Sequence, residues 1–167
     1  MKKKGQIWTV DFITGFVLFI IIIFVALKLI INLVPNNQYE NIYREGSGLS
    51  TTLLKPGYPN SWNETTVILP GIAENNRINL TKLSRYDNMS YGRLKTLFHL
   101  SNEYIFLFRN ATSVINISKC VRGFDIAVNT TTCEPDFSTI KYENLVRFDR
   151  IVIINSTLSN MVIYLWN

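Results

Sequence analysis

Histidine and cysteine are scarce in this sequence, and their scarcity removes several kinds of chemistry. The 167 residues include one histidine, His99, and two cysteines, Cys120 and Cys133. CxxC, HExxH and clustered Cys/His patterns do not occur, so the sequence predicts no metal site. It also contains no G-x-S-x-G motif and no Walker-type phosphate loop. We therefore expect no cofactor and no enzymatic activity, and we interpret His99 as a packed or capping residue at a helix end.

Blocks of like charge are absent beyond the first few residues. The formal net charge is +5, but from Pro35 onward the chain has 13 basic and 11 acidic residues, and neither kind is clustered. Nucleic-acid binding domains carry a basic patch or stripe, so we expect no nucleic-acid partner. Charged residues make up 17% of the chain and hydrophobic residues 47%, a balance that favours a folded chain over a disordered one.

One long hydrophobic run dominates the N-terminal part. From Phe12 to Val34 the only residues that are not apolar are Thr14, Lys28 and Asn32. As a helix this run would extend about 34 Å, enough to cross a hydrocarbon core of about 30 Å. A removed secretory signal has a shorter apolar region followed by a small-residue cleavage site, and no such site follows here. The three lysines before the run predict a cytoplasmic N-terminus, with the rest of the chain outside the cell membrane.

The residues before this run carry a more specific pattern. Lys3-Lys4-Gly5 is followed by Gln6 and then by the hydrophobic segment. This order resembles the class III signal peptide of archaeal type IV pilin-like proteins. The resemblance implies that a prepilin peptidase cuts between Gly5 and Gln6 and that the helix stays on the mature chain. It also implies other pilin-like subunits as partners, in a homo- or hetero-oligomer.

An acidic residue near the start of the run departs from that family by one position. The resemblance places an acid at the fifth mature residue, which is Val10 here, whereas this chain has Asp11. An ionised carboxylate in hydrocarbon needs a partner, and a freed N-terminal ammonium on this chain or a neighbour would supply one. Alternatively, Asp11 rests in water at the cytoplasmic interface.

Helical patterns precede strand patterns in the rest of the chain. Helical spacing predicts one helix over 38–54 and two short helices within 78–100, with Asn79 and Ser90 as N-caps. The residues expected on the buried faces of these helices are Tyr39, Ile42, Tyr43, Leu49, Leu53, Leu80, Leu83, Tyr91, Leu94 and Leu97. After Ser101 the segments EYIFLFR, SVINIS, RGFDIAV, RFDRIVIIN and NMVIYLW are rich in β-formers, and the last two predict a hairpin.

The expected fold class is therefore α+β. A long N-terminal hydrophobic helix of transmembrane or pilin type precedes a small extracellular domain, which has short helices and an antiparallel sheet of about four or five strands. We expect a signal peptide at 1–5, a transmembrane or assembly helix at 6–34 and the extracellular domain at 35–167.

A second resemblance covers this outer part. LLKPGYPNSW, then LTKLSRYDNMSYGRLKTLF, then RIVIIN and MVIYLW at the end follow an order similar to that of many archaeal membrane-anchored pilin-like proteins. Its most specific residues are Leu53-Leu54, Gly57, Pro59 and Trp62.

Glycosylation sequons are more frequent than chance predicts. The composition leads us to expect about three N-x-S/T sequons, but seven occur, and all lie beyond the hydrophobic run: Asn63, Asn79, Asn88, Asn110, Asn116, Asn129 and Asn155. Asn79, Asn88 and Asn110 could instead be cap or turn residues. Outside the cytoplasm, Cys120 and Cys133 are expected to form one disulfide, with two buried free thiols as the alternative.

Two functions fit these patterns. The first is a structural subunit, minor rather than bulk, of an archaeal type IV pilus-like surface filament assembled through the N-terminal helix. The second is a single-pass, membrane-anchored envelope glycoprotein that does not polymerise and acts as a binding or adhesion module, with surface glycans as possible ligands.

Overall fold

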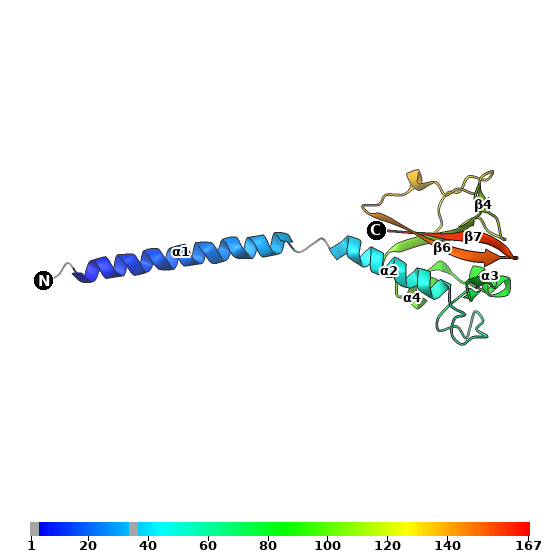
Figure 1. Ribbon diagram of the computed structural model, residues 1–167, viewed down its shortest axis with the longest axis horizontal. Coiled ribbons are helices and arrows are strands. Elements are labelled where there is room, and N and C mark those ends of the chain that lie inside the picture. The colour runs from blue at the N-terminus through cyan, green and yellow to red at the C-terminus, as the bar shows by residue number, and fades with distance from the viewer. Residues whose placement is uncertain (1–3, 34–36) are drawn as a thin grey trace. The chain divides into compact units, whose positions relative to one another are not determined.

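The computed structural model describes residues 4–33 and 37–167, with side chains described for 10–30 and 38–167. The chain forms two compact units, Met1–Asn37 and Gln38–Asn167, whose elements are labelled in Figure 1. One helix ends at Leu33 and the next begins at Asn37, and the residues between them lie outside the described part of the chain.

The first unit is a single helix, α1 (Lys4–Leu33). Its segment Val10–Ile30 is long and apolar enough to cross a membrane, and at about 1.5 Å per residue it spans roughly 31 Å. The large hydrophobic side chains of this segment are all at least 37% exposed. A helix that is apolar on every side is stable only where lipid or other helices surround it. The predicted N-terminal hydrophobic helix is confirmed.

The second unit begins with α2 (Asn37–Leu53), as predicted. Ile42, Leu49 and Leu53 are buried, whereas Tyr39 and Tyr43 are 57% and 53% exposed. The expectation that both tyrosines belong to the core was therefore wrong. Tyr39 and Tyr43 follow the helical spacing, but they lie beside the buried face of α2 that Ile42, Leu49 and Leu53 form.

A seven-stranded sheet forms the centre of this unit. Its main path runs β1-β2-β6-β7-β3-β4, and β5 also pairs with β3. All pairs are antiparallel except β2 with β6. The strands are β1 (Ala73–Glu74), β2 (Arg77–Ile78), β3 (Glu103–Arg109), β4 (Val114–Ile115), β5 (Arg122–Gly123), β6 (Leu145–Ile154) and β7 (Thr157–Trp166).

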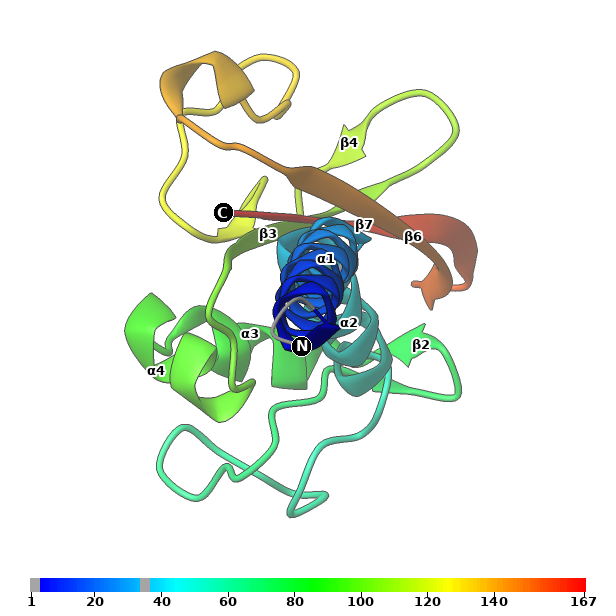
Figure 2. The ribbon, with the colours of Figure 1, turned by 90° about the vertical axis from the view of Figure 1, so that its left-hand side faces the viewer.

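Three elements cover one face of the sheet: α2, α3 (Leu80–Asp87) and α4 (Tyr91–Leu97). Alternate residues of the long strands, such as Phe106 and Ile163, pack there in the main core. The opposite face carries Leu107 and Val162 and is covered by residues from the segment 110–144, which contains the disulfide and a short 3-10 helix (Phe137–Thr139). Figure 2 shows the helices on one side of the sheet and this segment on the other. The predicted α+β fold is confirmed.

Several details differ from the sequence-based prediction. The sheet has seven strands rather than the predicted four or five. Two strands that were not predicted, β1 and β2, precede the others and are joined by Asn75 and Asn76 in left-handed conformation. The segments SVINIS and RGFDIAV contribute only two paired residues each to the strands. Leu80, expected in the core, is 41% exposed, while Leu83 of the same helix is buried.

The loop after α2 is built around a buried tryptophan. Trp62 is fully buried, and its Nε1 donates a hydrogen bond to the Gly71 carbonyl at 3.0 Å. Gly57 has φ +80°, and a Cβ there would lie 2.5 Å from Trp62 Nε1. Glycine is required here both by the backbone conformation and by the close approach. The segment KPGYPNSW therefore owes its pattern to packing around this indole.

Candidate functional site

The predicted cleavage junction lies in the first turn of α1. The helix begins at Lys4, so Gly5 and Gln6 are helical, and a cut between them would leave the rest of the helix on the mature chain. The side chains of residues 4–9 lie outside the described part, as do Lys2 and Lys3 entirely. Cleavage at this junction stays a prediction.

Asp11 is exposed in the second turn of the same helix. Within the side chains described, it has no hydrogen-bond or ion-pair partner from its own chain. The nearby Thr14 hydroxyl donates to the Val10 carbonyl at 2.8 Å, which satisfies that polar group inside the helix. Both interpretations of Asp11, pairing with a neighbouring N-terminus and resting in interfacial water, stay predictions.

Six of the seven sequon asparagines are exposed, and Asn79 is half-buried. Three of the exposed ones share one local geometry, in which the side-chain Oδ1 accepts the backbone N–H of the sequon threonine two residues on. The distances are 2.9 Å at Asn63, Asn110 and Asn129. This Asx-turn uses the side-chain oxygen, so the amide nitrogen, the atom to which a glycan would be attached, takes no part in that hydrogen bond.

Two other sequon asparagines have structural roles. Asn79 is the N-cap of α3 and accepts from the Thr81 and Lys82 amides, as predicted. Asn88 donates its Nδ2 to Glu64 at 2.8 Å. Asn116 follows β4 and Asn155 lies in the β6–β7 turn with φ +48°. Glycosylation itself stays a prediction at all seven.

The two cysteines are joined. Cys120 and Cys133 form a disulfide with their Cα atoms 5.2 Å apart, as expected from the sequence. Cys133 is buried against Leu107 and Val162 of the sheet. The bond therefore closes a loop over one face of the sheet and indicates an extracytoplasmic location for this unit.

A buried ion pair fixes the segment that leads into the disulfide. Arg122 Nε lies 2.7 Å from Asp87 Oδ1, with side chains 1% and 8% exposed. The same guanidinium donates to the carbonyls of Ile117 and Lys119. Its donors are thus engaged within the chain, and the pair ties the 117–122 segment to the end of α3.

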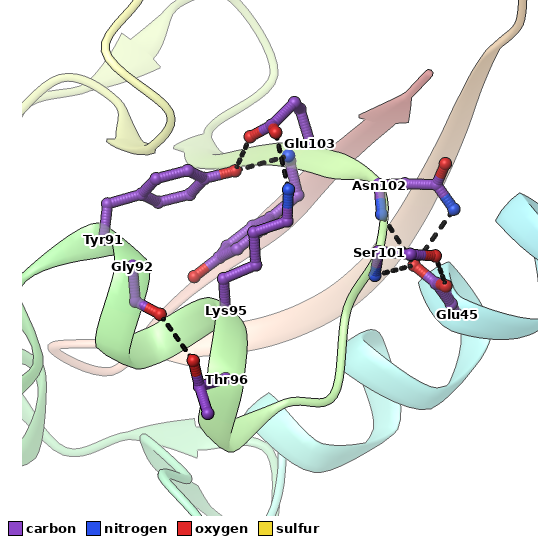
Figure 3. Close-up of polar contacts among 9 residues, drawn as sticks. Glu45, Tyr91, Gly92, Lys95, Thr96, Ser101, Asn102 and Glu103 are labelled. Atoms are coloured by element: carbon purple, nitrogen blue, oxygen red, sulfur yellow. Dashed lines mark hydrogen bonds and ion pairs between the residues drawn. The ribbon is translucent and has the colours of Figure 1, made fainter.

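A second polar cluster lies where α4 meets the start of β3 (Figure 3). Glu103 accepts from the Tyr91 hydroxyl and from Lys95 Nζ, the latter at 2.5 Å. The Tyr91 oxygen in turn accepts the Tyr104 amide at 3.2 Å, and the hydroxyls of Tyr104 and Tyr86 are 2.8 Å apart. Burial, followed by the Glu103 hydrogen bond, raises the pKa of Tyr91, and burial also raises the pKa values of Tyr86 and Tyr104. These tyrosines stay protonated at neutral pH, as structural hydrogen-bonding groups do.

Glu45 of α2 holds the neighbouring turn, also drawn in Figure 3. It accepts from the Ser101 hydroxyl and amide and from the Asn102 amide and side chain. Burial raises the pKa of Glu45, but these hydrogen bonds outweigh it and hold the pKa below its usual value. The carboxylate therefore links α2 to the start of β3.

A surface cavity of about 340 Å³ lies beside the Arg122 pair, bounded by α3, α4 and residues 119–128. Its wall includes the half-buried rings of Tyr91 and Phe124, which meet edge-on at 5.9 Å. The buried charges in the wall, Arg122 and Asp87, are already paired with each other. Aromatic rings beside polar groups such as those of Lys119 and Asp125 can hold an apolar or sugar face.

The single histidine belongs to a helix end. His99 has φ +55°, and the amides of His99 and Leu100 donate to the carbonyls of Thr96 and Lys95. This pattern is a Schellman motif that ends α4. The capping role is confirmed, but the side chain is exposed rather than packed.

Sequence reasoning missed the residues that carry most of the polar organisation: Glu45, Lys82, Asp87, Glu103 and Arg122. Their partners lie in other elements, from 8 residues away in the pairs Lys82–Glu74 and Lys95–Glu103 to 56 in the pair Glu45–Ser101, so no helical or strand spacing identifies the pairs. Lys82 is an example: it is 5% exposed, and its Nζ donates to Pro56 O, Asn60 Oδ1 and Glu74 Oε1 at 2.8, 3.0 and 2.8 Å. The one available signal was that a basic residue falls within the apolar face of a short helix.

Residues with metal-binding side chains do not converge within the described part of the chain: no group of three or more His, Cys, Asp or Glu there could hold an ion. Comparisons of the chain with known protein families, with curated proteins and with solved structures find no match. Sequence and structure together establish an N-terminal apolar helix followed by a mixed α/β domain with one disulfide.

Proposed function

We propose that this chain is a pilin-like structural subunit of an archaeal type IV pilus-like surface filament, in a minor rather than a bulk role. The observation that carries the proposal is the position of the Gly5-Gln6 junction at the start of α1. A cut there removes the lysines and keeps the apolar segment Val10–Ile30. The retained helix would first anchor the subunit in the membrane and then pack against the helices of neighbouring subunits.

The outer unit supports this proposal through its location. A disulfide and exposed sequons suit a domain that lies outside the cell, with α1 crossing the membrane once and the N-terminus in the cytoplasm. The polar clusters described above tie helices and turns together rather than activating a reacting atom. We accordingly propose an assembly and display role, not an enzymatic one, with a prepilin peptidase and other pilin-like subunits as partners.

Co-expression of the full chain with an archaeal prepilin peptidase tests the processing step. The wild-type chain should lose residues 1–5, whereas Gly5→Val should stay at full length. The control is Gly15→Val, because a Cβ at Gly15 meets nothing within 4 Å; this variant should be processed normally. Equal processing of wild type and Gly5→Val, or none in either, would contradict the proposal.

A second function is favoured by one observation. The acid in the helix is Asp11, one residue beyond the position that the resemblance implies, and each residue turns an α-helix by about 100°. A carboxylate displaced by about 100° around the helix does not face the same neighbour. This favours a membrane-anchored glycoprotein that does not polymerise and binds partners through its outer unit.

Shearing of cells that produce the chain separates the two functions. A filament subunit should appear in the sheared, sedimentable fraction. Recovery only from detergent-solubilised membranes would favour the anchored glycoprotein.

A further inference from the structure

The sheet of the outer unit has a free edge along most of β6. On one side, β6 pairs with β7 over its whole length, from Leu145 to Ile154. On the other side, β2 reaches it only at Ile153, opposite Arg77. Within the described part of the chain, residues 145–151 thus have no strand on that side. An open edge of this length is a template for pairing with another chain.

The backbone groups that face this edge can be identified. The Ile153 amide donates away from β7, to the Asn76 carbonyl at 2.8 Å. In an antiparallel ladder, alternate residues direct their N–H and C=O groups to the same side. The outward groups are therefore those of Leu145, Arg147, Asp149 and Ile151.

These four residues also share one face of the sheet. The alternate residues Val146, Phe148 and Val152 are buried against the helices, so the side chains of the outward set lie on the opposite face. Arg147 and Asp149 are about half exposed, at 49% and 47%, and Ile151 is 63% exposed. The edge thus combines free backbone groups with accessible charged and apolar side chains.

We propose that this edge pairs with β6 of a second copy of the chain, antiparallel, about a two-fold axis at Phe148. In that register Arg147 of one copy lies opposite Asp149 of the other, on both sides of the axis. Leu145 lies opposite Ile151 in the same way. Directly opposed charges of opposite sign and opposed apolar side chains are the pairs that stabilise antiparallel strands.

The charges also select this register over its neighbours. Outward residues can pair only with outward residues, so a symmetric pair can shift only by two positions. A register with its axis at Arg147 places Arg147 opposite Arg147 of the second copy. A register with its axis at Asp149 places Asp149 opposite Asp149 of the second copy. Like charges directly opposed are destabilising, so only the register centred on Phe148 is complementary.

The other charges and rings near the axis are compatible with pairing. Arg150, on the inner face, donates to Ser50 Oγ at 3.1 and 3.0 Å and stays within its own chain. The Arg147–Asp149 ion pair, 2.8 Å within one strand, can be exchanged for the same contacts across the axis. The exposed Tyr43 ring, 5.4 Å from the Phe148 ring, lies beside the axis, where a second copy would cover it.

A two-fold interface of this kind closes on itself and does not extend into a filament. It is therefore independent of assembly through α1 and adds a second, pairwise contact between outer units.

Charge exchange tests the pairing in the full-length chain in mild detergent, with molecular mass measured by sedimentation. Wild type should form dimers, and Arg147→Asp or Asp149→Arg alone should weaken dimerisation at least about tenfold, because each places like charges in both cross-axis pairs. The double variant R147D/D149R should dimerise as wild type does. An equimolar mixture of R147D with D149R should form mixed dimers, because one edge is then acidic and the other basic.

A monomeric wild type would overturn the proposal. Dimers of equal strength in all variants would also overturn it, because they would mean that α1 or another surface drives association. Circular dichroism and an intact Cys120–Cys133 bond check folding. If one of the two single variants misfolds, the other decides: weakened dimerisation supports the proposal, and dimerisation as strong as that of wild type overturns it.

Discussion

Gly46 and Gly48 lie two residues apart in α2 but have different surroundings. Both weaken a helix by propensity, and helical spacing alone does not distinguish them. A Cβ on Gly46 would lie 2.1 Å from Phe148 Cε2, whereas a Cβ on Gly48 meets nothing within 4 Å. Gly46 is therefore a packing position, where α2 approaches β6 closely, and Gly48 is an open one.

Substitution by alanine should separate the two. We expect Gly46→Ala to lower the free energy of unfolding by about 1–3 kcal/mol, because the ring of Phe148 must move. Gly48→Ala, the matched control, should raise it by about 0.5–1 kcal/mol through helix propensity alone. Urea denaturation followed by tryptophan fluorescence measures both; changes of the same sign would contradict the assigned packing.

The conformation of His99 leads to a second prediction. Its φ of +55° places a side chain where glycine is preferred. His99→Gly should therefore raise the free energy of unfolding by about 0.5–1 kcal/mol, while His99→Ala should leave it nearly unchanged. Thermal unfolding is sufficient to measure this. A clear loss of stability in the glycine variant would indicate that the imidazole has a role beyond the helix end.

Glu45 should make stability depend on acid pH. Burial raises the pKa of Glu45 in the folded chain, but the hydrogen bonds from Ser101 and Asn102 outweigh burial and lower it below the usual value. The stabilisation is present above the unfolded pKa of about 4.3 and is lost as pH falls through the folded value. We expect Glu45→Gln to flatten the fall in stability between about pH 5 and pH 3, and Ser101→Ala to flatten it partly. Identical pH profiles in all three chains would show that this carboxylate is not coupled to folding.

At the scale of elements, local patterns predicted most of the fold. The apolar run, the helix over 38–54, the Asn79 cap and the β6–β7 hairpin follow from residue spacing, and the structure confirms them. The strands β1 and β2, the close approach at Gly46 and the pairs Arg122–Asp87 and Lys82–Glu74 do not. The close approach at Gly46 and the Arg122–Asp87 pair join residues far apart in sequence. The Lys82–Glu74 pair and the two-residue strands β1 and β2 are local, but they are too short or irregular to leave a periodic signal.

The disulfide between Cys120 and Cys133 closes a loop whose contribution to stability can be measured by removing the bond. The loop covers part of one sheet face, and Cys133 is buried there. Replacing both cysteines by serine should lower the free energy of unfolding by about 2–4 kcal/mol, chiefly because the unfolded chain gains freedom. Reduction of the wild-type chain serves as the control and should have a similar effect. A change below about 0.5 kcal/mol, which is typical of surface substitutions, would contradict a structural role for the bond.

At the scale of the whole molecule, an exposed apolar helix precedes a disulfide-bonded α+β unit. The sequence resemblance to pilin-like proteins covers the first residues, where Gly5 and Gln6 lie ahead of the membrane-length segment, and the order of segments in the outer part. Glycosylation of the sequons in the outer unit depends on that unit lying outside the cell. The central claim is therefore that the chain is cut before its apolar helix and keeps it.

The N-terminus of the protein from its native membrane tests this claim most directly, read by intact mass and N-terminal sequencing. We expect a mature chain that begins at Gln6, retains Val10–Ile30, contains one disulfide and carries added mass in glycans. A chain that begins at Met1, or one that begins after the hydrophobic run, would contradict the account.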